Sequence, residues 1–136
     1  MKGFTHVLDT SAILAHYWDE PGADLVDDLF RSRGARLGVS TVTVAELRGL
    51  LSREDPVEAG EVGVVSRYVD DLAVSIPADR TIAELAWQLR AAAPQRLPLV
   101  DAIIAATARS CDAILVHKDS HLAGIPEGLV RQLVLA

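Results

Sequence analysis

Hydrophobic and polar positions along this chain follow two alternating patterns: short apolar runs, and longer stretches in which apolar residues return every three or four positions. The segment 5-THVLDTSAILAHYW-18 contains both, because an apolar run stops at Asp9 and Ile13, Leu14 and Tyr17 then recur at helical spacing. Continued along the chain, the pattern predicts strands at 4–9, 36–41, 72–76, 112–117 and 129–136. It predicts helices at 11–18, 21–33, 43–54, 57–71, 79–93 and 100–110.

Strands that alternate with helices indicate crossover connections, and hence a mostly parallel sheet with helices on both faces. We therefore predict an α/β fold, a three-layer α/β/α sandwich with a mostly parallel sheet of four to five strands. Because no repeat, low-complexity tract or linker interrupts the pattern, we expect a single domain over residues 1–136. In open α/β sheets ligands bind at the carboxyl ends of the strands, so residues that follow a strand are the first candidates for a functional site.

Composition bears on the core and the compartment. Apolar residues make up 50% of the chain but aromatic residues only 4%, which predicts a core of Ala, Val, Leu and Ile. The single Cys111 has no partner for an internal disulfide and lies in an Ala-rich helical stretch, which favours a buried free thiol in a reducing compartment. We find no signal-peptide pattern and no apolar run as long as a membrane span, so we expect a soluble, cytoplasmic protein with no membrane partner.

Two acidic residues draw attention because each follows a predicted strand. Asp9 ends the first apolar run, and Asp119 in 114-ILVHKDSHL-122 repeats the arrangement of apolar strand, acid and turn. Both positions suit a ligand site at the carboxyl edge of a sheet. Both also have a purely structural explanation, because Asp is a preferred helix cap and turn former.

Two further acids belong to predicted helices. Glu46 has no basic residue three or four positions away, so it lacks the local ion pair that surface helices often contain. Either a ligand role or a structural role, as a capped or long-range salt-bridged acid, explains it. Asp101 follows Pro98 at the start of a helix that is apolar on nearly every face. Such a helix is expected to be buried, so we expect Asp101 to lie in the interior of the fold. An acid at a helix start also favours the helix macrodipole, which is the structural alternative for Asp101.

In this order and context the acids resemble the PIN domain family and, within it, the VapC-type toxins of bacterial toxin–antitoxin pairs. The matching segments span essentially the whole chain; they are "VLDTSAILA", "VAELRGLL", "LPLVDAIIAATA" and "ILVHKDSHL". The resemblance implies that an acidic cluster of Asp9, Glu46, Asp101 and Asp119 binds Mg²⁺ or Mn²⁺. It also implies that Ser11 lies close by, as a hydroxyl able to hold a metal-bound water.

The resemblance carries a function as well. It implies a PIN-like fold and a metal-dependent endoribonuclease that hydrolyses phosphodiester bonds in tRNA or rRNA loops as the toxin of a toxin–antitoxin system. The implied partners are a cognate VapB-type antitoxin and a second copy of the chain in a homodimer. The chain departs from the family at His117, where many relatives carry Thr or Ser, and at His121, where many carry an acid or Asn.

Carboxylates suit this chemistry on physical grounds. Hard divalent cations prefer oxygen ligands, and such an ion lowers the pKa of a bound water and neutralises charge at a phosphoryl group. With a formal net charge of −6, the chain as a whole does not attract nucleic acid, so RNA binding would need bound metal or a local basic patch. Candidate basic residues are Arg31, Arg33 and Arg36 before the second strand, or Arg48 and Arg53.

Three other interpretations fit less of the sequence. His117 and His121 flank Asp119 and suggest a transition-metal centre, but no Cys or third His lies nearby; His121 also suits a general acid. A receiver-like phosphoacceptor domain would need an acid after the second strand, which instead ends in Ser40 and Thr41. A catalytically inactive protein-binding module would not need all four acids.

Overall fold

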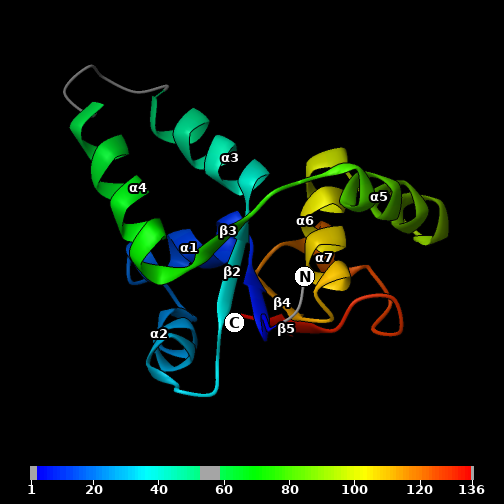
Figure 1. Ribbon diagram of the computed structural model, residues 1–136, viewed down its shortest axis with the longest axis horizontal. Helices are drawn as coiled ribbons and strands as arrows, with labels where there is room; N and C mark the ends of the chain where they lie inside the picture. The colour runs from blue at the N-terminus through cyan, green and yellow to red at the C-terminus, as the bar shows by residue number, and fades with distance from the viewer. Residues whose placement is uncertain (1–2, 53–58, 136) are drawn as a thin grey trace.

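The sheet at the centre of the fold is parallel throughout. The computed structural model describes residues 3–52 and 59–135 of the chain. Within them, five strands lie in the order β3-β2-β1-β4-β5, and each neighbouring pair is parallel (Figure 1). The strands are β1 (His6–Leu8), β2 (Leu37–Ser40), β3 (Val74–Ile76), β4 (Ile114–His117) and β5 (Gln132–Val134). The predicted α/β class and parallel sheet are confirmed.

The helices lie where the apolar spacing predicts them. They are α1 (Thr10–Tyr17), α2 (Ala23–Arg31), α3 (Thr41–Ser52), α4 (Ala59–Leu72), α5 (Arg80–Ala92), α6 (Leu99–Ser110) and α7 (Ser120–Ala123). The end of the helix predicted at 43–54 and the start of the one predicted at 57–71 fall at residues 53–58, outside the described residues. The pattern predicts a turn in place of α7, because four residues are too few to show a helical period.

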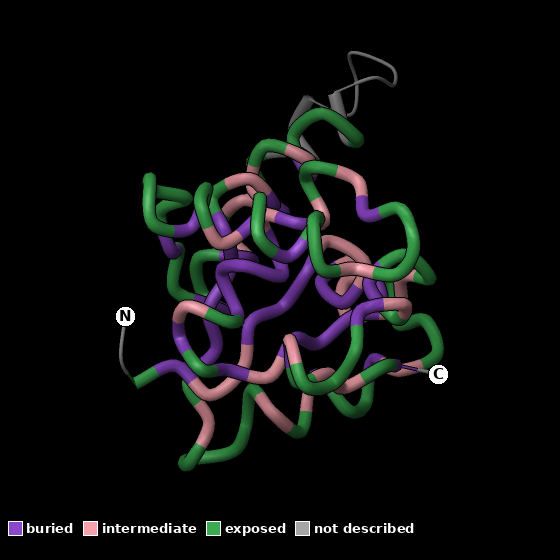
Figure 2. Tube along the Cα trace, turned by 90° about the vertical axis from the view of Figure 1, so that its right-hand side faces the viewer, coloured by how far each residue is buried: buried purple, intermediate pink, exposed green. Residues whose placement is uncertain are grey.

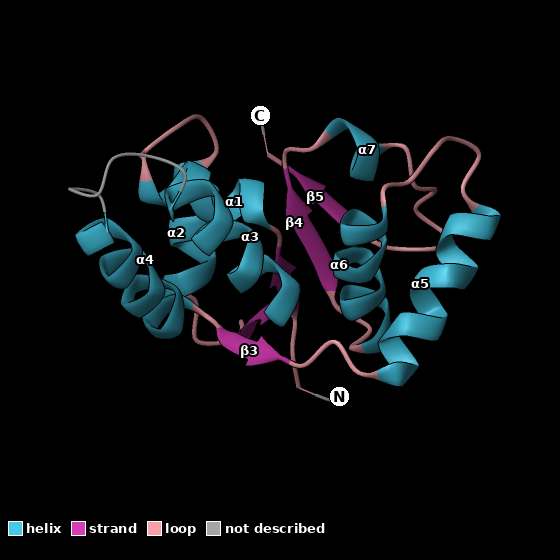
Figure 3. Cartoon of the chain, turned by 90° about the horizontal axis from the view of Figure 1, so that it is seen from above, coloured by secondary structure: helices cyan, strands magenta, loops and turns pink. Residues whose placement is uncertain are grey.

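The sheet separates two hydrophobic clusters, which confirms the three layers. Val7 packs in a cluster with residues of α5, α6 and α7, whereas its neighbour Leu8 packs with residues of α1, α2, α3 and α4. Successive residues of a strand point to opposite faces, so the short apolar strands contribute to both clusters. Figure 3 shows α1 to α4 on one side of the strands and α5 to α7 on the other, and Figure 2 shows the buried trace running through the middle.

The strand order creates a switch point between β1 and β4. The chain leaves β1 and adds β2 and β3 on one side, then returns through α5 and α6 to add β4 and β5 on the other. The ends of the two central strands are in register, with Leu8 opposite Val116, and the Asp9 amide donates to the Val116 carbonyl at 3.1 Å. Such a switch point opens a crevice at the carboxyl edge of the sheet, where α/β proteins bind ligands.

Two expectations from composition concern the core and membranes. Cys111 is a free, buried cysteine at the end of α6, as predicted for a thiol in an Ala-rich helix. Across residues 3–52 and 59–135, none of the helices is both long enough and apolar enough to cross a membrane.

Candidate metal centre

Asp9 stands at the carboxyl end of β1 and is also the N-cap of α1. Its Oδ1 accepts hydrogen bonds from the Ala12 amide at 2.8 Å and from the Ser11 hydroxyl at 2.7 Å, and the residue is only 4% exposed. Asp9 is therefore both a helix cap and a residue at the carboxyl end of a strand, and its role as a ligand stays a prediction. Burial raises the pKa of Asp9 to about 7 against the lowering effect of these hydrogen bonds, and the charges of Asp119 and Asp101 raise it further.

Ser11 connects Asp9 to the turn that follows β4. Its Oγ lies 2.7 and 2.9 Å from the two oxygens of Asp9 and accepts a hydrogen bond from the Lys118 amide at 2.9 Å. The hydroxyl thus fixes the start of α1 against a segment 107 residues away in the chain. Its predicted proximity to the acids is confirmed, while its role toward water stays a prediction.

Asp101 and Asp119 approach the same point from two different elements. Asp101 lies in the first turn of α6, and Asp119 caps α7, where its Oδ1 accepts hydrogen bonds from the amides of His121 and Leu122. Burial raises the pKa of Asp101 to about 6, with further contributions from the charges of Asp119 and Glu46, while His121 lowers it. One carboxylate oxygen of Asp101 lies within 4.8 Å of one of Asp119, so the two acids lie together and their charges repel.

Glu46 joins the group from α3, which begins directly after β2. The Thr10 hydroxyl donates to Glu46 Oε1 at 2.6 Å, so Glu46 has a neutral hydrogen-bond donor as its partner, from a residue 36 positions away. We missed Thr10 in the sequence analysis. The only signal for it in the sequence is its position next to Asp9. The four predicted acids therefore gather at the switch point, with Asp9 buried and the others partly accessible.

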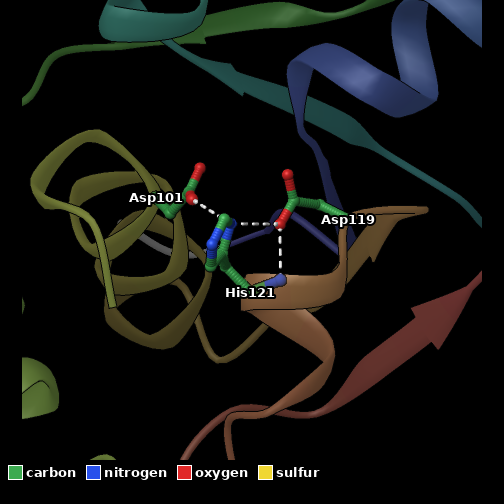
Figure 4. Close-up of side chains that lie close together, drawn as sticks. All are labelled: Asp101, Asp119 and His121. Carbon is green, nitrogen blue, oxygen red and sulfur yellow. Dashed lines mark hydrogen bonds and ion pairs between the residues drawn. The ribbon is translucent and has the colours of Figure 1, made fainter. Parts of the chain in front are cut away.

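Only one of the two histidines near Asp119 faces the acids. His121 Nδ1 lies 3.8 Å from Asp101 Oδ2 and 3.5 Å from Asp119 Oδ1 (Figure 4). His117 is fully buried; its Nδ1 accepts the Asp119 amide at 3.0 Å, and its Nε2 is therefore the atom that donates to Gln132 at 2.8 Å. Both ring nitrogens of His117 are thus occupied by hydrogen bonds within the fold, and burial lowers its pKa, so His117 is a structural residue and the paired-histidine metal centre is wrong.

Three of the five arginines proposed to assist RNA binding, Arg31, Arg33 and Arg36, lie at the opposite end of the sheet from the acids. Residues 31–36 precede β2, so in a parallel sheet they lie at the amino edge, away from the acids. Arg31 pairs with Asp27 at 2.7 Å, and the Arg36 guanidinium covers the Phe4 ring at 4.4 Å. Arg48 is exposed on α3, and Arg53 lies outside the described residues. Lys118 directly precedes Asp119, but its ammonium donates to the Pro21 carbonyl at 3.0 Å.

Comparisons with known proteins agree with this fold. The family model described as "PIN domain" matches residues 6–128. A chain in the crystal structure of VapBC2 from Rickettsia felis, bound to a promoter DNA fragment, superposes with a TM-score of 0.78 at 16% identity and covers 100% of both chains. A chain of VapBC-5 from Mycobacterium tuberculosis has a TM-score of 0.74 at 25% identity, with 98% of this chain and 100% of that chain covered. The curated proteins contain no match.

Proposed function

Because this chain belongs to the PIN domain family, we propose that it is a metal-dependent endoribonuclease and the toxin of a toxin–antitoxin pair. The observation that carries the proposal is the convergence of Asp9, Glu46, Asp101 and Asp119 at the switch point of a parallel sheet. Several solved structures of similar fold come from VapBC complexes, which supports the toxin assignment. We assign this activity to one domain over residues 1–136, acting in the cytoplasm.

The donor set fits Mg²⁺ or Mn²⁺. All four acids offer carboxylate oxygens, which hard divalent cations prefer, and their mutual repulsion is relieved by a cation. Asp9 supports the fit most directly, because a carboxylate that is 4% exposed and has no basic partner among its hydrogen bonds holds a proton up to about pH 7 in the absence of metal. When bound there, the ion supplies an activated water for attack on a phosphodiester and neutralises charge on the phosphoryl oxygens.

The residues of the chain hold the carboxylates ready for this role. Ser11 and the Ala12 amide orient Asp9, and Thr10 orients Glu46 from the adjoining turn of α1. Two backbone amides of α7 hold Asp119. Such supporting hydrogen bonds fix ligand geometry before the ion arrives, which lowers the cost of assembling the site.

We propose RNA as the substrate, on the resemblance to VapC-type toxins, and in particular tRNA or rRNA loops in which a phosphodiester is accessible to the acids. The receiver-like alternative has little support, since β2 ends in Ser40, a residue without a carboxylate. The direct test is incubation of the purified chain with total cellular RNA and with added Mg²⁺ or Mn²⁺. We expect discrete fragments that disappear in excess chelator, whereas RNA left intact in both metals would contradict the nuclease.

The toxin assignment predicts neutralisation by a partner. We expect that expression of the chain alone arrests growth, and that co-expression of a small VapB-type antitoxin restores it by binding the chain, which we propose to be a homodimer. Growth curves with each protein induced separately measure the effect, and an Asp101→Asn chain serves as the non-toxic control that still binds the antitoxin. Unimpaired growth at high expression of the wild-type chain would refute the toxin role.

A further inference from the structure

His121 faces the acids without forming a normal hydrogen bond to either. Its Nδ1 lies 3.5 Å from Asp119 Oδ1 and 3.8 Å from Asp101 Oδ2, and among the described residues neither contact meets hydrogen-bond geometry. A protonated imidazole that served as an ion-pair partner would approach a carboxylate oxygen to about 2.8 Å. The imidazole is therefore too far from either carboxylate for a hydrogen bond, but at a distance expected between two ligand atoms of the same metal ion.

The three side chains together form a donor triangle. One ligand atom each from Asp101, Asp119 and His121 lies within 4.8 Å of the other two. Donors bound to one ion at about 2.1–2.3 Å are at most about 4.6 Å apart, so a small contraction brings these atoms into a first coordination shell. Figure 4 shows the imidazole between the two carboxylates, and the second oxygen of each carboxylate pointing to the same side.

The remaining hydrogen bonds leave these donors available. Both amides that hold Asp119 donate to its Oδ1, so Oδ2 is not engaged by them. The His121 side chain is 53% exposed and sits on the short helix α7, whose backbone is fixed by that same carboxylate. The ring can therefore turn its Nδ1 toward an ion without disturbing the core.

We infer that His121 is a metal ligand of this chain and that its nitrogen makes the site prefer Mn²⁺ to Mg²⁺. The inference rests on the proposed function and concerns the same site. Mg²⁺ is a hard ion that demands oxygen donors in a near-ideal octahedron. Mn²⁺ accepts the same carboxylates, is larger, and begins the first-row series whose members bind imidazole, so exchanging one oxygen donor for nitrogen favours it.

The test measures binding and spectroscopy as well as cleavage. Electron spin echo envelope modulation of Mn²⁺ bound to the purified chain should show coupling to an imidazole nitrogen, and His121→Ala should remove that coupling. Titration calorimetry should show Mn²⁺ affinity falling at least about tenfold in His121→Ala, with a smaller loss for Mg²⁺. His121→Asn places an amide oxygen near the position of Nδ1, so it should also lose the nitrogen coupling but recover binding of Mg²⁺.

A matched control tests whether the effect is specific to His121 or follows from the removal of any histidine. His6 lies on β1 at the amino edge, where its Nδ1 is bonded to the Thr5 hydroxyl, so His6→Ala should keep both the nitrogen coupling and the Mn²⁺ affinity. Were His121 only a proton donor, His121→Ala would slow cleavage while nitrogen coupling and Mn²⁺ affinity stayed at wild-type values, and the inference would be overturned. Homogeneous Mn²⁺ binding without nitrogen coupling in the wild type overturns it as well.

The two proposals fail in distinguishable ways. A chain that shows nitrogen-coupled Mn²⁺ but cleaves no RNA refutes the nuclease and leaves the His121 assignment intact. A chain that cleaves RNA with Mn²⁺ but shows no nitrogen coupling refutes the assignment and leaves the nuclease intact.

Discussion

Replacing Asp9 by Asn is expected to lower the rate of metal-dependent RNA cleavage by at least about 100-fold, because a metal ligand and its charge contribute several kcal/mol to the transition state. Asn keeps the size of Asp and is an equally good helix cap, so the hydrogen bond from the Ala12 amide survives. Initial rates on one RNA substrate, with Mg²⁺ and with Mn²⁺, measure the loss. Circular dichroism of the same samples establishes that the variant is folded.

Asp79 provides the matched control for this substitution. It caps α5 with nearly the same backbone angles and accepts a hydrogen bond from the Ile82 amide at 3.0 Å, but it is exposed at the start of a different helix. Asp79→Asn should therefore leave cleavage within about twofold of wild type, since it changes a cap and no ligand. A folded Asp9→Asn chain that retained wild-type cleavage, or kept it in excess chelator, would refute the metal mechanism.

The same substitution is expected to stabilise the metal-free protein above neutral pH. The pKa of Asp9 is raised from 3.8 to about 7, chiefly by burial, so the folded chain binds its proton more tightly than the unfolded chain does. The stability that the protonated Asp9 contributes is therefore complete below about pH 4 and is lost as the pH rises through about 7. Asp101, with its pKa raised to about 6, adds to the loss in the same direction.

In chelator at pH 8, Asp9→Asn should increase the free energy of unfolding by roughly 2–4 kcal/mol, because the amide carries no charge to bury. The gain should shrink as the pH is lowered toward 4, where wild-type Asp9 is itself neutral. Urea unfolding at pH 5 and pH 8 measures both values. Added Mn²⁺ should raise the stability of the wild type with metal concentration, because it binds only the assembled site, and should raise that of Asp9→Asn much less.

Asp79→Asn is again the control, and its stability should match wild type within about 0.5 kcal/mol at both pH values. An ordinary capping role for Asp9 predicts a different pattern: Asp9→Asn would be neutral or destabilising, independent of pH, and the wild type would not respond to metal. Observing that pattern would remove the acidic cluster as a metal site.

Local patterns in the sequence were sufficient to predict the strands and helices and to place two of the four acids, Asp9 and Asp119. The period of apolar residues reflects which faces are buried, so the strands and the longer helices could be predicted with small errors at their ends. Asp9 and Asp119 could be placed at the carboxyl edge for the same local reason, since Asp9 directly follows β1 and Asp119 lies two residues after the end of β4. Residues 31–36 precede β2, which already implied that they lie at the amino edge of the sheet. The hypothesis that their arginines assist RNA binding at the acids could therefore have been rejected from the sequence.

Only the tertiary structure decided which distant residues meet. The strand order β3-β2-β1-β4-β5 depends on how helices pack on both faces, and several orders are compatible with one alternating pattern. That order brings Thr10 to Glu46 and Ser11 to Lys118, and it brings Asp101 from α6 within reach of His121. A single sequence carries no signal for such contacts, because a side chain's partners across the chain depend on packing rather than on the residues beside it. The sequence therefore determined the types of residue at the site, and the packing of the helices on the sheet determined their arrangement.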